Sequence, residues 1–180
     1  TDPIIGLSMG QTAEIIAHRF GISREKMDEF SLQSHQRLAA AQDAGIFKDE
    51  LNPVYNRKNH YYSYDSGLRR DTRLEKLASL KPFFFIFFGL VTAGNSSQVT
   101  DGAAFLVLAS EKAVQQYQLP VLARIVDVVW AGVEPSEMGL GPVHAVSILL
   151  KKQQLAFNRI DFWEINEAFA MVTMCPIDEF

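Results

Sequence analysis

Two stretches of the sequence are the most informative: Thr92-Ala93-Gly94-Asn95-Ser96-Ser97-Gln98-Val99-Thr100-Asp101-Gly102-Ala103 and, more than sixty residues later, Asn166-Glu167-Ala168-Phe169-Ala170. The small residues of the first stretch allow a backbone to approach a ligand closely. The second stretch follows residues 161–165, which we predict to be a short buried strand. Asn166 therefore stands where open α/β sheets tend to bind ligands.

Both stretches have simpler explanations when they are taken one at a time. Asn166 could only N-cap the helix that follows it. The first stretch could be no more than a turn-rich loop, since Asn, Ser, Asp and Gly all favour turns. Asn95-Ser96-Ser97 is also formally a glycosylation sequon. Spacing alone leaves these alternatives open.

Together, the two stretches resemble the corresponding motifs of thiolases, enzymes that make or break a carbon–carbon bond between acyl-CoA thioesters. The resemblance runs from about Met9 to Ala170. It also includes Gly21-Ile22-Ser23-Arg24-Glu25, Ser34-His35-Gln36, Leu80-Lys81-Pro82 and Met138-Gly139-Leu140-Gly141-Pro142. The resemblance implies an α/β fold, the layered α/β/α architecture of thiolases in incomplete form, with a mostly helical loop domain.

The resemblance also implies three parts of the chain. Residues 1–95 would form the loop domain that covers CoA, residues 96–133 the end of the N-terminal thiolase half, and residues 134–180 the start of the C-terminal half. Neither half is complete. Buried parallel strands need neighbours on both sides, so we expect the chain by itself to expose apolar surface.

The site residues are likewise implied by the resemblance. Asn166 would hold the water of an oxyanion hole, where a preorganised neutral donor stabilises the enolate that forms when the α-proton leaves. Arg69 would pack on the CoA adenine, because a guanidinium stacks on aromatic planes while it stays charged. The remaining matches are Ala93 and Ser97 at the pantetheine arm, and Met9 and Phe169 at the acyl pocket. Outside this family context, Arg69 would belong to a solvated basic cluster and Met9 to a core.

Residues that thiolases require are absent from these 180. Members of the family use a nucleophilic Cys near the N-terminus, a Gly-His-Pro histidine and a second Cys near the C-terminus. Cys175 lies in Met174-Cys175-Pro176 without flanking glycines, so we interpret it as a buried or terminal thiol. The chain therefore resembles the middle of a thiolase, the family of acetyl-CoA acetyltransferases and 3-ketoacyl-CoA thiolases, and we expect it to be inactive alone.

The resemblance implies an acyl-CoA C-acyltransferase of lipid metabolism and fatty-acid β-oxidation. It would catalyse thiolysis of 3-ketoacyl-CoA or the reverse Claisen condensation, with coenzyme A as a substrate and no further cofactor. The intact enzyme would be a homo-oligomer, either a dimer or a tetramer. The alternative from another class is a thiolase-like protein that binds acyl-CoA or lipid without catalysis. The acetoacetyl-CoA-forming biosynthetic branch also stays open.

Composition restricts the remaining possibilities. The net charge of −4 gives no general attraction to nucleic acid. A single Cys is compatible with a reducing compartment, either a bacterial cytoplasm or an organelle matrix, and no signal peptide is visible. The four His residues show no metal-ligand spacing, so we expect no metal. Phe83-Phe84-Phe85-Ile86-Phe87-Phe88 is far shorter than the about 20 apolar residues of a membrane span, and we predict a buried strand.

The other elements are predicted from periodicity and capping residues. Residues 46–71 are polar and Tyr-rich, which indicates an excursion over the surface. The predicted helices cover residues 11–20, 23–45 after a Ser23 cap, 73–80 with a Thr72–Glu75 capping box, two turns after Ser110, and 139–154 with Pro142 in the first turn. The predicted buried strands cover residues 103–109 and 121–129.

Gly6-Leu7-Ser8-Met9-Gly10 fits the nucleophile elbow of α/β-hydrolases. An elbow follows a central strand and needs an oxyanion loop upstream. Only Thr1–Ile5 precede this one, and Pro3 interrupts them. We therefore do not assign a hydrolase site to this stretch.

Overall fold

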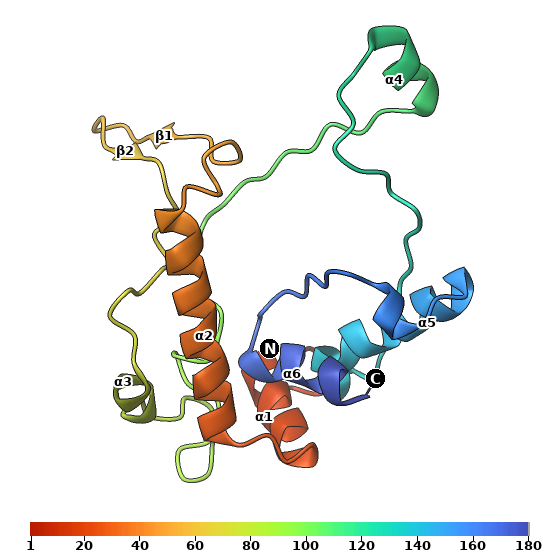
Figure 1. The fold of residues 1–180 in the computed structure, drawn as a ribbon. Coiled ribbons are helices and arrows are strands. Elements are labelled where there is room, and N and C mark those ends of the chain that lie inside the picture. The colour runs from red at the N-terminus through yellow and green to blue at the C-terminus, as the bar shows by residue number, and fades with distance from the viewer. Residues whose placement is uncertain (180) are drawn as a thin grey trace.

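The computed structural model describes residues 1–179, with side chains for residues 1–175. Most of its helices lie close together, and α4 (Glu111–Tyr117) stands away from them at the end of two long extended segments (Figure 1). In chain order, the elements are α1 (Met9–Arg19), α2 (Arg24–Asp43), β1 (Val54–Tyr55), β2 (Tyr61–Tyr62), α3 (Leu74–Ala78), α4 (Glu111–Tyr117), the 3₁₀-helix η1 (Pro135–Leu140), α5 (Gly141–Gln153), the 3₁₀-helix η2 (Phe157–Arg159) and α6 (Ala170–Glu179).

The predicted helix pair at the N-terminal end is confirmed. The α1 helix begins after Ser8, whose hydroxyl accepts the N–H of Gln11 at 3.3 Å while the Gln11 side chain accepts the N–H of Ser8 at 2.8 Å. This capping box was not predicted. Gly21, at φ +61°, follows α1, and Ser23 caps α2 by accepting the N–H of Lys26. Each boundary therefore comes from a local backbone requirement.

The core forms where α6 crosses the other helices. The α6 helix contacts α1, α2, α5 and η1. The buried cluster consists of Ala13, Ile16, Ala17, Ile22, Met27, Val91, Leu140, Ala170, Met171, Val172 and Cys175. Because α6 begins directly after the Asn-Glu-Ala-Phe motif, the core fixes the position of that motif against α2.

The predicted strands at residues 103–109, 121–129 and 161–165 are not present. These segments are extended but unpaired, and Phe105 is 93% and Leu122 98% exposed. A strand needs neighbours to satisfy its backbone donors and acceptors, and the described residues offer these segments none. The expectation of exposed apolar surface is confirmed.

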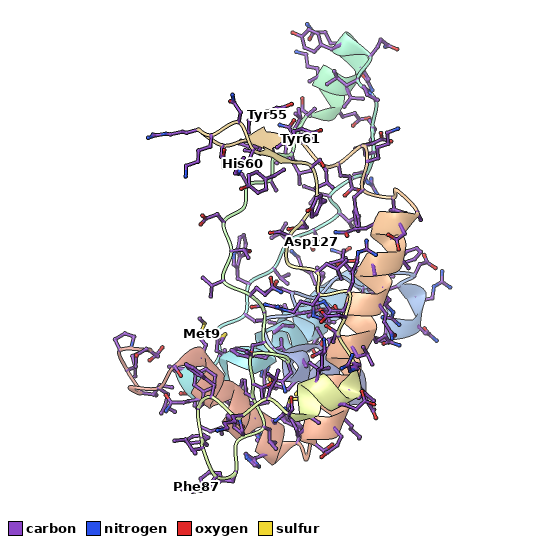
Figure 2. All side chains as sticks on the ribbon, turned by 90° about the vertical axis from the view of Figure 1, so that its left-hand side faces the viewer. Met9, Tyr55, His60, Tyr61, Phe87 and Asp127 are labelled. Carbon is purple, nitrogen blue, oxygen red and sulfur yellow. The ribbon has the colours of Figure 1, made fainter. Side chains whose placement is uncertain are left out.

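The aromatic run is also not a buried strand. Residues 83–88 form a turn, and Phe87 is 94% exposed at its tip (Figure 2). Phe84 packs against the core, with its ring over Gly10, where a Cβ atom would lie 1.9 Å from the ring. The run therefore contributes one aromatic side chain to the interior and presents others to solvent.

The α3 helix is shorter than predicted. It covers Leu74–Ala78, and Arg73, not Thr72, is the N-cap residue, without a side-chain capping bond. With Arg73 at the N-cap, Glu75 stands at the second helical position, one short of the third position that a capping box needs, and its carboxylate lies 3.9 Å from the exposed Arg73 guanidinium. The other predicted helices are confirmed to within a few residues, with η1 placed before α5 and Pro142 in the first turn of α5.

The surface excursion at residues 46–71 is confirmed. It carries the antiparallel pair β1–β2, in which Val54 faces Tyr62 and Tyr55 faces Tyr61. The rings of Tyr55 and Tyr61 lie 5.0 Å apart. Figure 2 shows this hairpin at the opposite end of the molecule from Phe87.

Candidate functional site

The two motifs, far apart in sequence, meet in the structure. The N–H of Ser97 donates to the carbonyl of Ala168 at 2.9 Å, and the N–H of Ala170 donates to the carbonyl of Asn95 at 3.0 Å. An antiparallel β-bridge lies between these bonds. Residues 92–98, here called the small-residue loop, are thereby paired with the Asn-Glu-Ala-Phe segment.

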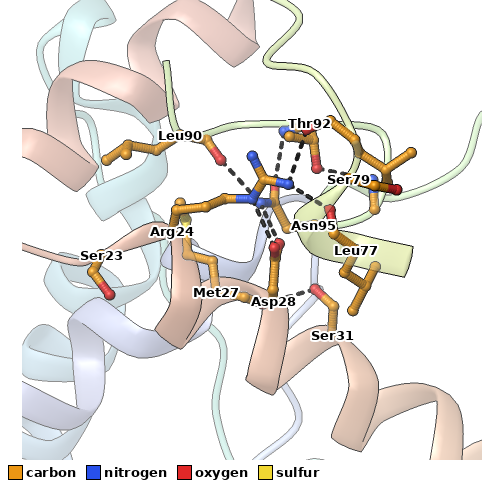
Figure 3. A network of polar contacts seen from close by, with 12 residues as sticks. Ser23, Arg24, Met27, Asp28, Ser31, Leu77, Ser79, Leu90, Thr92 and Asn95 are labelled. Carbon is orange, nitrogen blue, oxygen red and sulfur yellow. Dashed lines mark hydrogen bonds and ion pairs between the residues drawn. The ribbon is translucent and has the colours of Figure 1, made fainter. Parts of the chain in front are cut away.

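A buried network holds the small-residue loop from below (Figure 3). The Asn95 side chain is buried; its oxygen accepts the N–H of Thr92 at 2.8 Å, and its nitrogen donates to Asp28 at 3.1 Å and to the carbonyl of Leu90 at 3.0 Å. Asp28 also pairs with Arg24, with 2.7 Å between Oδ2 and Nε. Because the Asn95 amide is fully engaged, the sequon at this position is unsuited to glycosylation.

The same network reaches the neighbouring segments. The Arg24 guanidinium donates to the carbonyls of Leu77 at 2.6 Å and Leu80 at 3.1 Å, which ties α3 to α2. The Glu14 carboxylate is fully buried and accepts the N–H groups of residues 90–91 at 2.7 and 2.9 Å. Charge-assisted bonds of this kind are stronger than neutral ones, so the segment that leads into the loop is fixed to α1.

A cavity of about 300 Å³ lies above the paired motifs. Ser97 and Asn166 line it from the two motifs, and Ser34 and His35 line it from α2. The Ser34 hydroxyl donates to the Glu167 carboxylate at 2.7 Å, which connects α2 to the residue next to Asn166. The structure thus places two of the predicted site residues, Ser97 and Asn166, on one cavity.

A second cavity, of about 380 Å³, holds two more predicted residues, Arg69 and Ala93, together with Lys76. The cavities adjoin one another, and the residues common to both are His35, Gly94, Ser96 and Gln98. Arg69 and Lys76 bring two positive charges to the end far from Asn166, and Asp71, which pairs with Lys76, brings one negative charge, so the net charge there is positive. An elongated ligand with an anionic end could lie along both cavities.

Two predicted residues, Met9 and Phe169, line neither cavity. Met9 is 66% exposed at the start of α1, and Phe169 packs against the core. Asn166 is exposed in an extended segment, and α6 begins only at Ala170, so the alternative in which Asn166 caps this helix is wrong. Its amide is therefore not used by a helix end.

His35 was not predicted as a site residue. It is half-buried on the α2 face that turns toward the small-residue loop, and its Nδ1 accepts the N–H of Arg69 at 3.4 Å. Burial lowers the pKa of His35, the charge of Arg69 lowers it further, and Glu167 opposes the shift. The sequence signal was the position of His35 one residue after Ser34, on the same side of α2 as Phe30, Ser31 and Leu38, which also line the first cavity.

Among the side chains described, no three His, Cys, Asp or Glu residues are grouped so that they could hold a metal ion. Cys175 is buried in the core, which confirms the prediction of a buried thiol and leaves it outside both cavities. None of the described helices is long and apolar enough to cross a membrane.

Known proteins that are similar to this chain are thiolases, in agreement with the two motifs. Residues 1–112 match the model for the thiolase N-terminal domain, and residues 119–180 match the model for the thiolase C-terminal domain. The chain belongs to the thiolase family. It is 45% identical over 181 residues to rat peroxisomal 3-ketoacyl-CoA thiolase B, covering 96% of this chain and 42% of that protein.

Two solved thiolases share the fold. Human mitochondrial 3-ketoacyl-CoA thiolase in complex with CoA matches with a TM-score of 0.94 at 44% identity, covering 99% of this chain and 45% of that one. The dimeric peroxisomal thiolase of Saccharomyces cerevisiae matches with a TM-score of 0.93 at 39% identity, covering 96% of this chain and 44% of that one. The predicted α/β thiolase fold is confirmed, and this thiolase chain spans less than half the length of these relatives.

Proposed function

We propose that these residues act within a longer acyl-CoA C-acyltransferase that catalyses thiolysis of 3-ketoacyl-CoA or the reverse Claisen condensation. The backbone pairing of the small-residue loop with the Asn-Glu-Ala-Phe segment carries this proposal. It brings the segment of Asn166 to that of Ser97, so that both residues line one cavity, and Arg69 and Ala93 line the adjoining one. Such an arrangement suits a long ligand with a reactive end and a charged end.

In this proposal, Asn166 is the catalytic residue of the chain. Its neutral amide would hold a water against the thioester oxygen, where negative charge develops, and the amide would not itself titrate. Ser97 and Ala93 would lie along the pantetheine arm, and Arg69 would stack on the adenine. The acyl pocket would include Met9 and Phe169 once further residues cover them.

The covalent chemistry would come from residues outside these 180. One Cys thiolate would take the acyl group and a second would move the proton. CoA is then a substrate, and the proposed mechanism needs no other cofactor. The partition into a loop domain of residues 1–95 and two partial halves of residues 96–133 and 134–180 belongs to the same proposal.

The assembly and location are also proposals. The yeast relative is described as dimeric and the rat relative as peroxisomal. We propose that the intact protein is a homo-oligomer that works in an organelle matrix. Its apolar segments at residues 103–109 and 121–129 would then be covered by the rest of the enzyme.

The proposal is tested by Asn166→Ala in the full-length enzyme. We expect kcat for thiolysis to fall roughly 10²-fold, the scale for loss of one oxyanion donor, with a smaller change in KM. Asn158→Ala, which replaces an exposed Asn outside both cavities, is the matched control. The 180-residue chain alone should show no turnover.

Two outcomes would contradict the proposal. An unchanged kcat in Asn166→Ala would remove Asn166 from the chemistry. A full-length wild-type protein that binds CoA but turns over no 3-ketoacyl-CoA would instead favour the thiolase-like acyl-CoA or lipid-binding protein.

A further inference from the structure

His35 is the titratable side chain that lines both cavities of the site. Its Nδ1 accepts the backbone N–H of Arg69 at 3.4 Å. The charge of the Glu167 carboxylate acts to raise the pKa of the His35 ring. Glu167 stands directly after Asn166 and is held by Ser34 on the same helix. One imidazole therefore connects the segment that carries Arg69 with the segment that carries Asn166.

We propose that His35 is a positioning residue whose neutral imidazole holds the Arg69 backbone at the ligand site, so that acid weakens ligand binding by releasing Arg69. This inference rests on the proposed CoA site. It adds a residue and a pH dependence to that site. His35 touches no reacting atom in this proposal and acts through Arg69.

The geometry fixes which form of His35 is competent. A backbone N–H can only donate, so Nδ1 must present a lone pair, and the neutral ring then carries its proton on Nε2. Protonation places a hydrogen on Nδ1, facing the N–H of Arg69. Two donors then oppose each other, and a second positive charge is added beside the Arg69 guanidinium.

The charges around the ring set the pH range. Arg69 disfavours the protonated ring and Glu167 favours it, and the other charged side chains that line the two cavities are Asp65, Asp71 and Lys76. Lys76 pairs with Asp71, which reduces the influence of both on His35. Burial is the largest effect and, with Arg69, lowers the pKa of His35. The contact to Arg69 is therefore intact at neutral pH and is lost as the pH falls through a value below the usual histidine pKa of about 6.5.

Calorimetric titration of the full-length enzyme with CoA at pH 7.5 and pH 5 tests the proposal. His35→Ala should weaken binding roughly 2- to 10-fold at the higher pH, the scale of one hydrogen bond. His35→Gln offers an amide oxygen that does not titrate, so it should keep the wild-type affinity at pH 7.5 and bind more tightly than wild type at pH 5. The CoA phosphates titrate equally in every variant, so differences between variants report His35.

The control is His60→Gln, which replaces an exposed His on the turn of the hairpin (Figure 2). Its CoA affinity should equal that of the wild type at both pH 7.5 and pH 5. A second measurement needs no variant. In the wild-type protein, the NMR shift of the Arg69 amide should change with the same midpoint as the His35 ring.

The outcomes separate the two proposals. No CoA binding by the wild type at either pH would overturn the CoA site itself. CoA binding with the same loss in acid for the wild type and His35→Gln, or an Arg69 amide that does not follow His35, would overturn the positioning role and leave the CoA site standing.

Discussion

The small-residue loop at residues 92–98 and the apolar segment at residues 103–109 are near neighbours in the chain, yet their burial is the reverse of their polarity. Thr92 and Asn95 are 1% and 3% exposed, whereas Phe105 is 93% exposed. Burial in these two segments depends on which of them has hydrogen-bonding and packing partners. A polar group can be buried when each hydrogen bond is satisfied, and an apolar strand cannot be buried without neighbours.

The partners of the loop come from α1 and α2. Asp28 and Glu14 are buried carboxylates, and each meets the donors that it needs, namely Arg24 and Asn95 for Asp28 and backbone N–H groups for Glu14. The apolar segment receives no such support from the described residues. The loop is therefore preformed, and the apolar segment stays exposed among the described residues.

The largest expected effect comes from breaking the network under the loop. Asp28→Ala would leave Arg24 and the Asn95 amide without their buried acceptor, which typically costs about 3–5 kcal/mol of unfolding free energy. Urea unfolding followed by circular dichroism measures the loss. Asp43→Ala, which removes the exposed pair with Arg70, is the control and should cost far less. Equal losses would mean that the buried network does not hold the loop.

The next effect compares apolar side chains in the two environments. Met27 is fully buried, so Met27→Ala should lower the unfolding free energy by about 2–5 kcal/mol through lost contacts and a cavity. Leu106 is 87% exposed, and Leu106→Ala should change it by less than about 0.5 kcal/mol. The same denaturation assay on the 180-residue chain applies. A large loss for Leu106→Ala would show that residues 103–109 are packed in solution.

These contrasts explain which features the sequence could predict. Caps and turns depend on neighbours within a few residues, so Ser23, Gly21 and the Ser110 cap of α4 were predicted. Strands depend on partners far away, and the predicted strand at residues 121–129 was wrong for that reason. The predicted capping box at Thr72 was wrong because the helix begins one residue later than predicted, with Arg73 as its N-cap residue.

The site shows the same division. The motifs around Ser97 and Asn166 could be recognised from sequence, because their residue types and order carry the resemblance. The roles of His35 and Asp28 could not, since they depend on groups more than thirty residues away, namely the backbone N–H of Arg69 for His35 and the side chain of Asn95 for Asp28. Local patterns identify the ligand-facing segments, and tertiary contacts identify what supports them.

The smallest expected effect concerns Asp127, which ties the extended segment after α4 to α5. It pairs with Lys152 at 2.7 Å and accepts a bond from Gln153, and the hydrogen bond from Lys152 is the first cause that lowers the pKa of Asp127. Stability from this pair is present above the unfolded pKa of about 3.9 and is lost as the pH falls through the lower folded value.

NMR titration of the Asp127 carboxyl should give a pKa below the usual aspartate value. Lys152→Gln should raise it toward that value and change the unfolding free energy less than Asp28→Ala or Met27→Ala does. Lys151→Gln, one residue earlier on α5, is the matched control. An Asp127 pKa that is unchanged in Lys152→Gln would contradict the contact between the extended segment and α5.

Amide hydrogen exchange on the 180-residue chain tests the contrast between the two segments most directly. Protection reports the free energy of opening each backbone hydrogen bond. We predict protected amides at Ser97 and Ala170, where the two motifs pair, and unprotected amides throughout residues 103–109. Fast exchange at Ser97 and Ala170 together with slow exchange at residues 103–109 would contradict the account.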